Sequence, residues 1–221
     1  MSTNSEIRKR ARNALEGNWG IAVIATLIVY AVAYGLQMVA SGMCTNVYGT
    51  SGSSLLLGLL TLPLVWGFYL FFLALVKGGD DSGSLGILLE GYTKNRFLTV
   101  FMTMFLVNLY EFLWFLLLII PGIMKSLSYA MTPFILKDNP DISAVDAIHR
   151  SRVMMDGHKM KLFIMYLSFI GWGLLCLLTL GLGFLLLIPY IKTSEATFYQ
   201  DLLAEEKQIS NQEDKDDVDN I

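Results

Sequence analysis

The stretch LFIMYLSFIGWGLLCLLTLGLGFLLLIPYI, residues 162–191, contains no Asp, Glu, Lys, Arg or His. A longer run without these residues covers residues 17–76. A helix that crosses the ~30 Å hydrocarbon core of a bilayer needs about 20 mostly apolar residues. A core helix of a soluble protein instead keeps one polar face. Both runs exceed the length of one crossing, so the sequence predicts an all-α protein that spans a membrane several times.

The overall composition agrees with these two runs. Hydrophobic residues make up 54% of the 221 residues and charged residues only 16%, whereas soluble domains carry about 25% charged residues. The first apolar run begins at Trp19, follows a basic segment and continues well beyond the short apolar region of a cleavable signal peptide. We therefore expect this run to remain in the protein as a membrane anchor.

Six spans are expected within a membrane domain of residues 1–204. Their approximate ranges are 19–40, 55–76, 95–110, 112–136, 161–179 and 183–203. The boundary between the third and fourth spans has two solutions. A cut at Pro121-Gly122 gives spans 97–120 and 122–136, which leaves the fourth only about 22 Å long and places Glu111 inside the membrane. A cut near Glu111 avoids both costs, so we prefer it.

The chain reads as three copies of one unit, each a cytoplasmic amphipathic helix followed by two spans. Similar tripeptides end the three amphipathic helices, and a proline then lies in each second span. The tripeptides are Leu15-Glu16-Gly17, Leu89-Glu90-Gly91 and Met155-Asp156-Gly157, and the prolines are Pro63, Pro121 and Pro189. The sequence therefore predicts a repeat-built polytopic transmembrane helical bundle.

Helical spacing defines the apolar face of each amphipathic helix. The expected faces are Ile7, Ala11 and Leu15 in the first helix, Leu85, Leu88, Leu89 and Tyr92 in the second, and Val145, Ile148 and Met155 in the third. Ser143 with Asp146 three residues later resembles a capping box at the start of the third helix. Such helices either lie in the membrane interface or pack on the cytoplasmic ends of the spans, and both alternatives are open.

The basic residues predict the orientation, because cytoplasmic loops are enriched in Lys and Arg. One side carries four of them in the N-terminal segment, three in residues 77–96 and five in residues 137–161, while the opposite loops carry none. Both termini should therefore be cytoplasmic. Residues 201–221 hold eight acidic residues and two lysines, and we expect residues 205–221 to form an acidic disordered cytoplasmic tail.

Three segments carry a resemblance to a known family. They are IIPGIMKSLSYAMTPFILKDNPDIS (residues 119–143), SRVMMDGHKMKLF (151–163) and FIGWGLLCLLTLGLGFLLLIPYIKTSEATFYQDL (169–202). Together they resemble the bacterial integral membrane family catalogued as domain of unknown function 975, most specifically at Pro121-Gly122 with Lys125, at Ala147 with Ser151 and Gly157, and at Ile188-Pro189 with Lys192. The resemblance covers nearly the whole chain except the acidic tail. It implies a polytopic protein of the bacterial cytoplasmic membrane and implies no activity.

A more distant similarity is to the membrane domains attached to some glycerophosphodiester phosphodiesterases. The sequence contains no such catalytic domain, so this similarity adds no enzymatic expectation.

Polar residues that follow the second and third prolines form a candidate intramembrane site. They are Lys125, Ser126 and Ser128 after Pro121, and Lys192, Thr193, Ser194 and Glu195 after Pro189. A proline inside a helix frees a backbone carbonyl and kinks the helix, and kinks are expected at Pro63, Pro121 and Pro189. The polar residues could then line a small wet cavity. Alternatively, the lysines extend to the interface and the hydroxyls bond their own helix.

The sequence holds no motif for catalysis, a cofactor or a metal. His149 and His158 are its only histidines and have no metal-site spacing, and Cys44 and Cys176 do not make a disulfide framework. The basic clusters at residues 8–12 and 150–161 are suited to anionic lipid rather than to nucleic acid.

Three functional hypotheses follow, and one of them is a membrane enzyme that acts on lipid. The first is a non-enzymatic membrane protein that organises or senses the membrane or scaffolds a partner. The alternative is a small transporter or channel-like protein with a polar path after Pro121 and Pro189. A protein partner or a homo-oligomer is left open.

Overall fold

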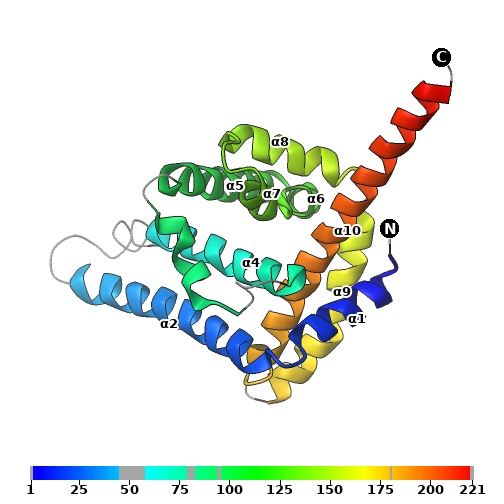
Figure 1. Ribbon diagram of the computed structural model, residues 1–221. Coiled ribbons are helices and arrows are strands. Elements are labelled where there is room, and N and C mark those ends of the chain that lie inside the picture. The colour runs from blue at the N-terminus through cyan, green and yellow to red at the C-terminus, as the bar shows by residue number, and fades with distance from the viewer. Residues whose placement is uncertain (1, 45–57, 79–82, 94–95, 180, 220–221) are drawn as a thin grey trace.

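The computed structural model describes residues 2–44, 58–78, 83–93, 96–179 and 181–219, and every element within these ranges is helical (Figure 1). The elements are α1 (Asn4–Leu15), α2 (Trp19–Cys44), α4 (Leu62–Lys77), the 3-10 helix η1 (Leu85–Tyr92), α5 (Phe97–Leu117), α6 (Ile119–Tyr129), α7 (Thr132–Asp138), α8 (Ala144–Met154), α9 (Lys159–Leu178) and α10 (Phe184–Asp219). The start of the predicted second span, residues 55–57, lies outside the described residues.

Five helical stretches of the described chain are long and apolar enough to cross a membrane. They are Trp19–Val39, Gly58–Lys77, Phe97–Leu116, Ile119–Asp138 and Lys159–Leu178. The predicted sixth span corresponds to the first half of α10, which is not among them because Lys192, Glu195 and Asp201 interrupt its apolar sequence. The all-helical class agrees with the sequence prediction, and five stretches have the length and apolar composition that spanning helices need.

The predicted boundary between the third and fourth spans was wrong. Helix α5 continues through Glu111 to Leu117, and the chain turns at Leu118, whose backbone is extended (φ −163°, ψ 141°). Glu111 is half-buried inside the α5–α6 hairpin and faces the Ser126 side chain, so the hairpin itself partners this carboxyl group. The break therefore lies close to the alternative cut at Pro121-Gly122.

Only one of the three predicted proline kinks lies within a helix. Pro63 occupies the first turn of α4 and Pro121 the first turn of α6, where a backbone N–H has no helical partner to lose. Pro189 lies inside α10. Pro133, which the sequence pattern did not single out, begins the separate helix α7. The prolines at positions 63 and 121 thus start helices instead of bending them.

Helices α4, α7 and α10 form the interior, and α2, α5 and α9 lie outside them. About half of the apolar windows containing α4 and α6–α7 are buried, at 56%, against only 17–22% for α2, α5 and α9. The Trp66 indole of α4 donates a 2.9 Å hydrogen bond to the Pro133 carbonyl at the start of α7. Phe71, Phe134 and Phe198 are fully buried in this interior.

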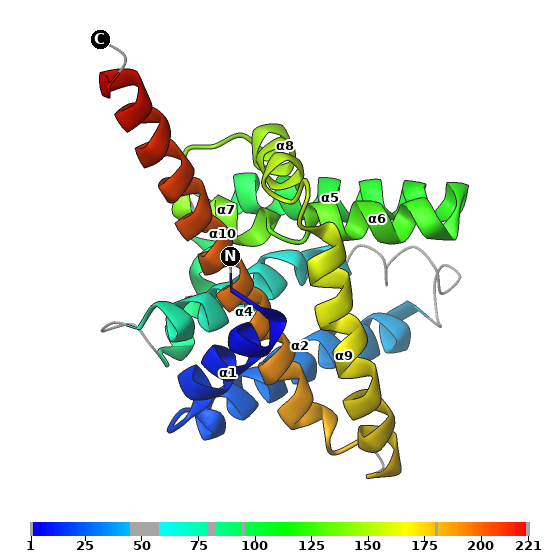
Figure 2. The same cartoon turned by 90° about the vertical axis from the view of Figure 1, so that its right-hand side faces the viewer.

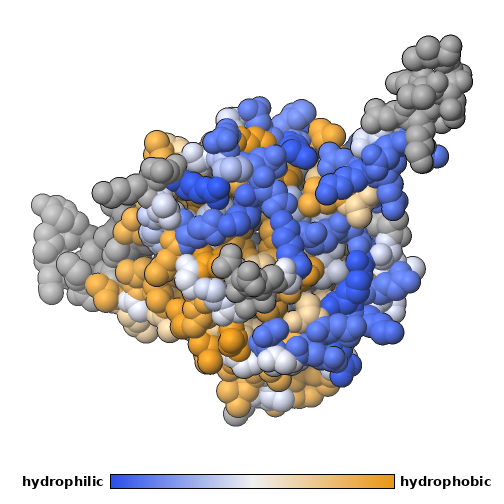
Figure 3. Space-filling view, viewed as in Figure 1, coloured by the Kyte–Doolittle hydropathy of each residue, from blue (hydrophilic) through white to orange (hydrophobic). Residues whose placement is uncertain are grey.

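The long helices do not form a parallel stack. In Figure 2 the joined ends of α5 and α6 lie at the right, whereas the joined ends of α9 and α10 lie at the bottom. In the view of Figure 3, hydrophilic side chains gather over α1, α8 and α10, whereas hydrophobic side chains gather over α2 at the lower left. The arrangement leaves apolar surface on the outer helices.

The buried faces of the three amphipathic helices agree with the predicted faces in α1 and differ from them in η1 and α8. Ile7, Ala11 and Leu15 of α1 are all buried, as the sequence predicts. In η1 Leu88 is buried but Leu89 is exposed, because a 3-10 helix has three residues per turn. Its buried face is therefore spaced by three residues. In α8 Val145 is exposed, and the buried face consists of Ala147, Ile148 and Ser151.

Side-chain caps fix two of these helices at their N-termini. Thr3 and Glu6 form a reciprocal capping box at the start of α1, and its hydrogen bonds hold the pKa of the exposed Glu6 carboxyl below its usual value. Ser143 caps α8 by accepting a hydrogen bond from the Asp146 backbone N–H, which confirms the predicted start of that helix. Gly17 and Gly157 follow α1 and α8 with φ of +83° and +78°, a conformation that favours glycine.

Each amphipathic helix packs on an interior helix. Helix α1 lies along α10, η1 lies on α4, and α8 lies on α5, α6 and α7. Glycines permit the closest of these contacts, because a Cβ at Gly67 would lie 2.2 Å from the Leu88 carbonyl oxygen and one at Gly91 would lie 2.6 Å from the Pro63 carbonyl oxygen. Backbones thus touch where η1 crosses α4.

The predicted disorder of residues 205–221 was wrong for the described part. Helix α10 continues to Asp219, and residues 220–221 lie outside the described chain. Glu, Lys and Gln have high helix propensity, and the helix is anchored before it leaves the bundle. Arg10 of α1 pairs with Asp201, and Arg150 of α8 lies 3.7 Å from Glu206. Helix growth from an anchored end avoids the cost of nucleation.

We expect Gly67→Ala to destabilise the protein, because the new methyl group would collide with the backbone of η1. The free energy of unfolding should fall by about 1–3 kcal/mol, as for other overpacked sites. The matched control is Gly35→Ala in α2, where a Cβ meets nothing within 4 Å. The measurement is the thermal unfolding midpoint in detergent. A Gly67→Ala midpoint equal to that of Gly35→Ala would contradict the close contact.

Candidate functional site

A buried polar cluster lies where α4, α9 and α10 meet. The Lys192 ammonium donates hydrogen bonds to both carboxylate oxygens of Glu195, at 2.9 and 3.1 Å, and to the Tyr69 hydroxyl at 3.0 Å. It also lies 4.2 Å from the centre of the Tyr69 ring. The Tyr166 side chain of α9 faces Glu195 from the other side. Lys192 and Glu195 thus share one site with two tyrosines.

The burial of this ion pair makes its two charges mutually dependent. The Glu195 side chain is 5% exposed and the Lys192 side chain 22% exposed. A charge held away from water needs a partner and hydrogen bonds to offset its lost hydration. Lys192, Glu195 and Tyr69 provide both for one another. The cluster therefore acts first as a polar contact that fixes the register between α4 and α10.

Aromatic and charged side chains extend this contact to α7. Tyr69 meets Phe134 edge to face with ring centres 5.6 Å apart, and Phe134 stacks on Tyr199 at 5.2 Å. The Tyr199 hydroxyl donates a 3.0 Å hydrogen bond to Asp138, whose second oxygen accepts one from Lys77 at 2.6 Å. The three interior helices are therefore joined by a chain of polar and aromatic contacts.

The sequence did not single out Tyr69, Asp138 and Tyr199. A weak signal was available for Tyr69, which lies in the charge-free run of residues 17–76. A buried tyrosine hydroxyl in such a run needs a hydrogen-bond partner. Nothing in the pattern connects Tyr199 with Asp138, 61 residues away, because that pairing depends on how α7 meets α10.

The predicted hydroxyls of α10 bond their own helix. Thr193 donates to the Pro189 carbonyl, Ser194 to the Tyr190 carbonyl, and Thr197 to the Thr193 carbonyl, each at 2.8 Å. Both Thr193 and Ser194 are fully buried. This arrangement is the predicted alternative to a wet cavity, because the hydroxyls already have partners four residues back.

The predicted polar residues of α6 have separate surroundings. The Lys125 ammonium lies 4.8 Å from the centre of the Trp114 ring of α5. The Ser128 hydroxyl donates to the Met124 carbonyl, and the Ser128 carbonyl accepts a 2.8 Å hydrogen bond from Ser151 of α8. Lys125 thus contacts α5, whereas Lys192 contacts α4. The structure does not join the two predicted halves into one group through these contacts.

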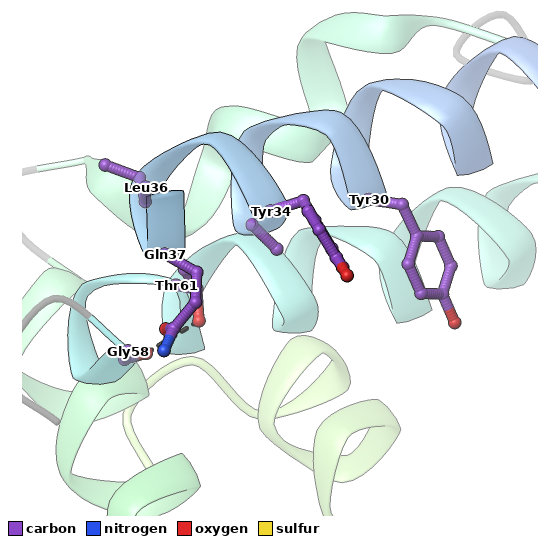
Figure 4. A pocket seen from close by; sticks show the side chains of 7 residues that line it. Tyr30, Tyr34, Leu36, Gln37, Gly58 and Thr61 are labelled. Atoms are coloured by element: carbon purple, nitrogen blue, oxygen red, sulfur yellow. Dashed lines mark hydrogen bonds between the residues drawn. The ribbon is translucent and has the colours of Figure 1, made fainter. Parts of the chain in front are cut away.

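Several hollows lie apart from this cluster, among them the following two. One, of about 260 Å³, lies between α2 and the segment before α4 and is lined in part by Tyr30, Tyr34 and Gln37 of α2 and by Thr61 (Figure 4). Thr61 closes part of its wall by donating a 2.6 Å hydrogen bond to the Gly58 carbonyl. The other, of about 540 Å³, lies between α1, α9, α10 and the start of α2.

Among the described residues, no group of three or more His, Cys, Asp or Glu side chains is placed to hold a metal ion.

One comparison with known proteins gives a match. The family described as "Protein of unknown function (DUF975)" matches residues 1–128 and 115–206, which leaves only the last 15 residues unmatched. No curated protein and no solved structure matches the chain.

The buried ion pair can be tested with a double-mutant cycle. We expect Lys192→Met or Glu195→Leu alone to lower the free energy of unfolding by about 3–5 kcal/mol, because each leaves one buried charge without its partner. The double variant should recover much of this loss, since no unpaired charge remains. Unfolding in mixed micelles provides the measurement.

Lys125→Met is the matched control for this cycle, because Lys125 lies over an aromatic ring and not beside a carboxylate. It should cost far less than Lys192→Met. Strictly additive losses in the Lys192 and Glu195 double variant would show that the two side chains are not coupled.

Proposed function

The chain belongs to the DUF975 family of proteins of unknown function, and we propose that it is a non-enzymatic multi-pass protein of a bacterial cytoplasmic membrane that organises or senses the lipid around it or scaffolds a partner. The observation that carries the proposal is the exposure of α2, α5 and α9, because only 17–22% of their apolar stretches is buried inside the protein. Soluble monomers rarely expose apolar surface on this scale. Lipid chains are a suitable environment for it.

We propose six spans, with the first half of α10 as the sixth. Its charged residues do not argue against this assignment, because they are paired inside the protein. Lys192 and Glu195 bind each other, and Asp201 binds Arg10 of α1. Ionisable residues are tolerated within membrane helices when they face the interior and have partners. An even number of spans also supports two cytoplasmic termini.

The packing supports three repeated units. The first helix of each unit contacts the last helices of the preceding unit, as α5 contacts α4 and α9 contacts α6. The same relation closes the circle, because α2 of the first unit contacts α10 of the third. The amphipathic helices likewise pack on the preceding unit, with η1 on α4, α8 on α5, α6 and α7, and α1 on α10. One packing relation thus occurs three times.

The non-enzymatic part of the proposal is supported by the contacts of the polar residues. Lys192 binds Glu195 of its own helix, and Asp138 of α7 accepts a hydrogen bond from Tyr199 of α10. The α10 hydroxyls donate to backbone carbonyls. A catalytic group must be able to reach a substrate. The exposed positive charge instead lies on the amphipathic helices, where the two basic clusters are suited to anionic lipid headgroups.

A transport function is the second candidate, and one observation favours it. The Lys192–Glu195 pair lies within the proposed sixth span, and ionisable residues at such positions often bind ions or relay protons. Transport would require water to reach this pair, whereas a packed structural contact would not. Water access therefore distinguishes the two functions.

Cysteine accessibility tests topology and water access together. In a protein whose Cys44 and Cys176 are replaced by alanine, single cysteines are placed at Thr179, at Lys207 and along residues 190–198. A membrane-impermeant maleimide should label position 179 in intact cells and position 207 only in inverted vesicles. Positions 192–197 should stay unlabelled because their side chains pack inside the protein.

Each position should be labelled after denaturation, which controls for intrinsic reactivity. Labelling of positions 179 and 207 from the same side would contradict the proposed sixth span. Labelling of positions 192 and 195 in the folded protein would instead support a water-filled path and transport.

A further inference from the structure

The hollow beside α1 combines positive charge with an apolar wall. It has a volume of about 540 Å³. Its lining residues are Arg8, Arg12, Trp19, Trp172, Cys176, Gly183, Leu186, Leu187 and Tyr190. The arginines come from the amphipathic helix, and the apolar side chains come mainly from the α9–α10 hairpin. We call this hollow the α1 groove.

The two arginines act on the same part of the groove. They are four residues apart and therefore share one face of α1. The charges of both act on the Tyr190 hydroxyl, which donates a 3.4 Å hydrogen bond to the Arg8 carbonyl. No ion pair of Arg8 or Arg12 is observed within the described ranges, whereas Arg10 of the same helix is paired with Asp201. The groove thus has positive charge available for an anion.

The opposite wall is suited to hydrocarbon. Trp172 is 58% exposed and Leu186 is 54% exposed, while Leu187 and Cys176 are buried beneath them. Gly183 allows α10 to approach α9 closely at this wall, because a Cβ there would lie 2.6 Å from the Cys176 sulfur. Exposed apolar side chains beside two arginines make the groove amphipathic.

We propose that the α1 groove binds one anionic phospholipid, with its phosphate between Arg8 and Arg12 and an acyl chain against Trp172 and Leu186. Arginine matches phosphate geometry and can form paired hydrogen bonds with it. A free phosphate ion would leave the apolar wall unused, and a zwitterionic lipid would use less of the positive charge. The inference rests on the proposed membrane location and deepens it by naming the lipid class and the site.

Native mass spectrometry of the full chain released from detergent micelles can test this. The probes are phosphatidylglycerol, phosphatidylcholine with the same acyl chains, and soluble glycerol 3-phosphate. We expect one phosphatidylglycerol per chain to be retained in preference to phosphatidylcholine. Arg8→Gln with Arg12→Gln should weaken that binding about thirty-fold, the loss expected for two charges near a lipid headgroup.

Two further variants separate charge at the groove from charge elsewhere. Lys9→Gln with Lys207→Gln removes the same net charge from exposed positions that do not line the groove, and it should leave lipid retention unchanged. Arg8→Lys with Arg12→Lys should keep the preference for phosphatidylglycerol, because it preserves the charge. Trp172→Ala should weaken retention of both lipids, since it removes part of the apolar wall.

Several outcomes would overturn the proposal. They are equal retention of the two lipids, full competition by glycerol 3-phosphate, an effect of the Lys9 and Lys207 variant as large as that of the arginine variant, or a lipid-free dimer in which a second copy covers the groove. If cysteine labelling supports the six spans and any of these results is obtained, the lipid site fails and the membrane architecture stands. Labelling of positions 179 and 207 from the same side would instead contradict the proposed membrane architecture itself.

Discussion

The charge of Lys192 is the constraint on which the interior depends. The part of α10 that precedes Lys192 is apolar, and the part that follows it is buried. The ammonium group therefore needs partners inside the protein. Glu195 provides the counter-charge from the same helix, and Tyr69 provides an oxygen from α4. Once Tyr69 is fixed, its ring positions Phe134 of α7. The three interior helices therefore owe their mutual register to a small number of polar atoms within an otherwise apolar core.

The sequence predicted the helices better than it predicted their contacts. Charge-free runs and basic loops are local properties, so all-helical structure, the faces of α1 and the cap at Ser143 could be inferred directly. The boundary near Glu111 could not, because this carboxyl group finds Ser126 across a hairpin and no local pattern shows that partner. Leu89 was placed on the wrong face because a 3.6-residue period was applied to a 3-10 helix. The α10 tail was misread because its charged residues favour both solubility and helix formation.

The candidate polar site shows the same division. Lys192 and Glu195 were both assigned to the candidate site from the sequence, and the structure joins them as an ion pair. Lys125 was grouped with them by analogy between two prolines, but it lies over Trp114 instead. Proline at the start of α6 and proline inside α10 have different consequences for the residues that follow. Matching sequence positions did not produce matching environments.

The contact between α1 and α10 has a consequence for how the protein is made. Helix α1 leaves the ribosome well before α10, the helix along which it lies. During synthesis Ile7, Ala11 and Leu15 therefore cannot complete their native packing until α10 has been made. Helix α1 can therefore take its final place only after α10 has emerged, which makes its docking a late step of folding.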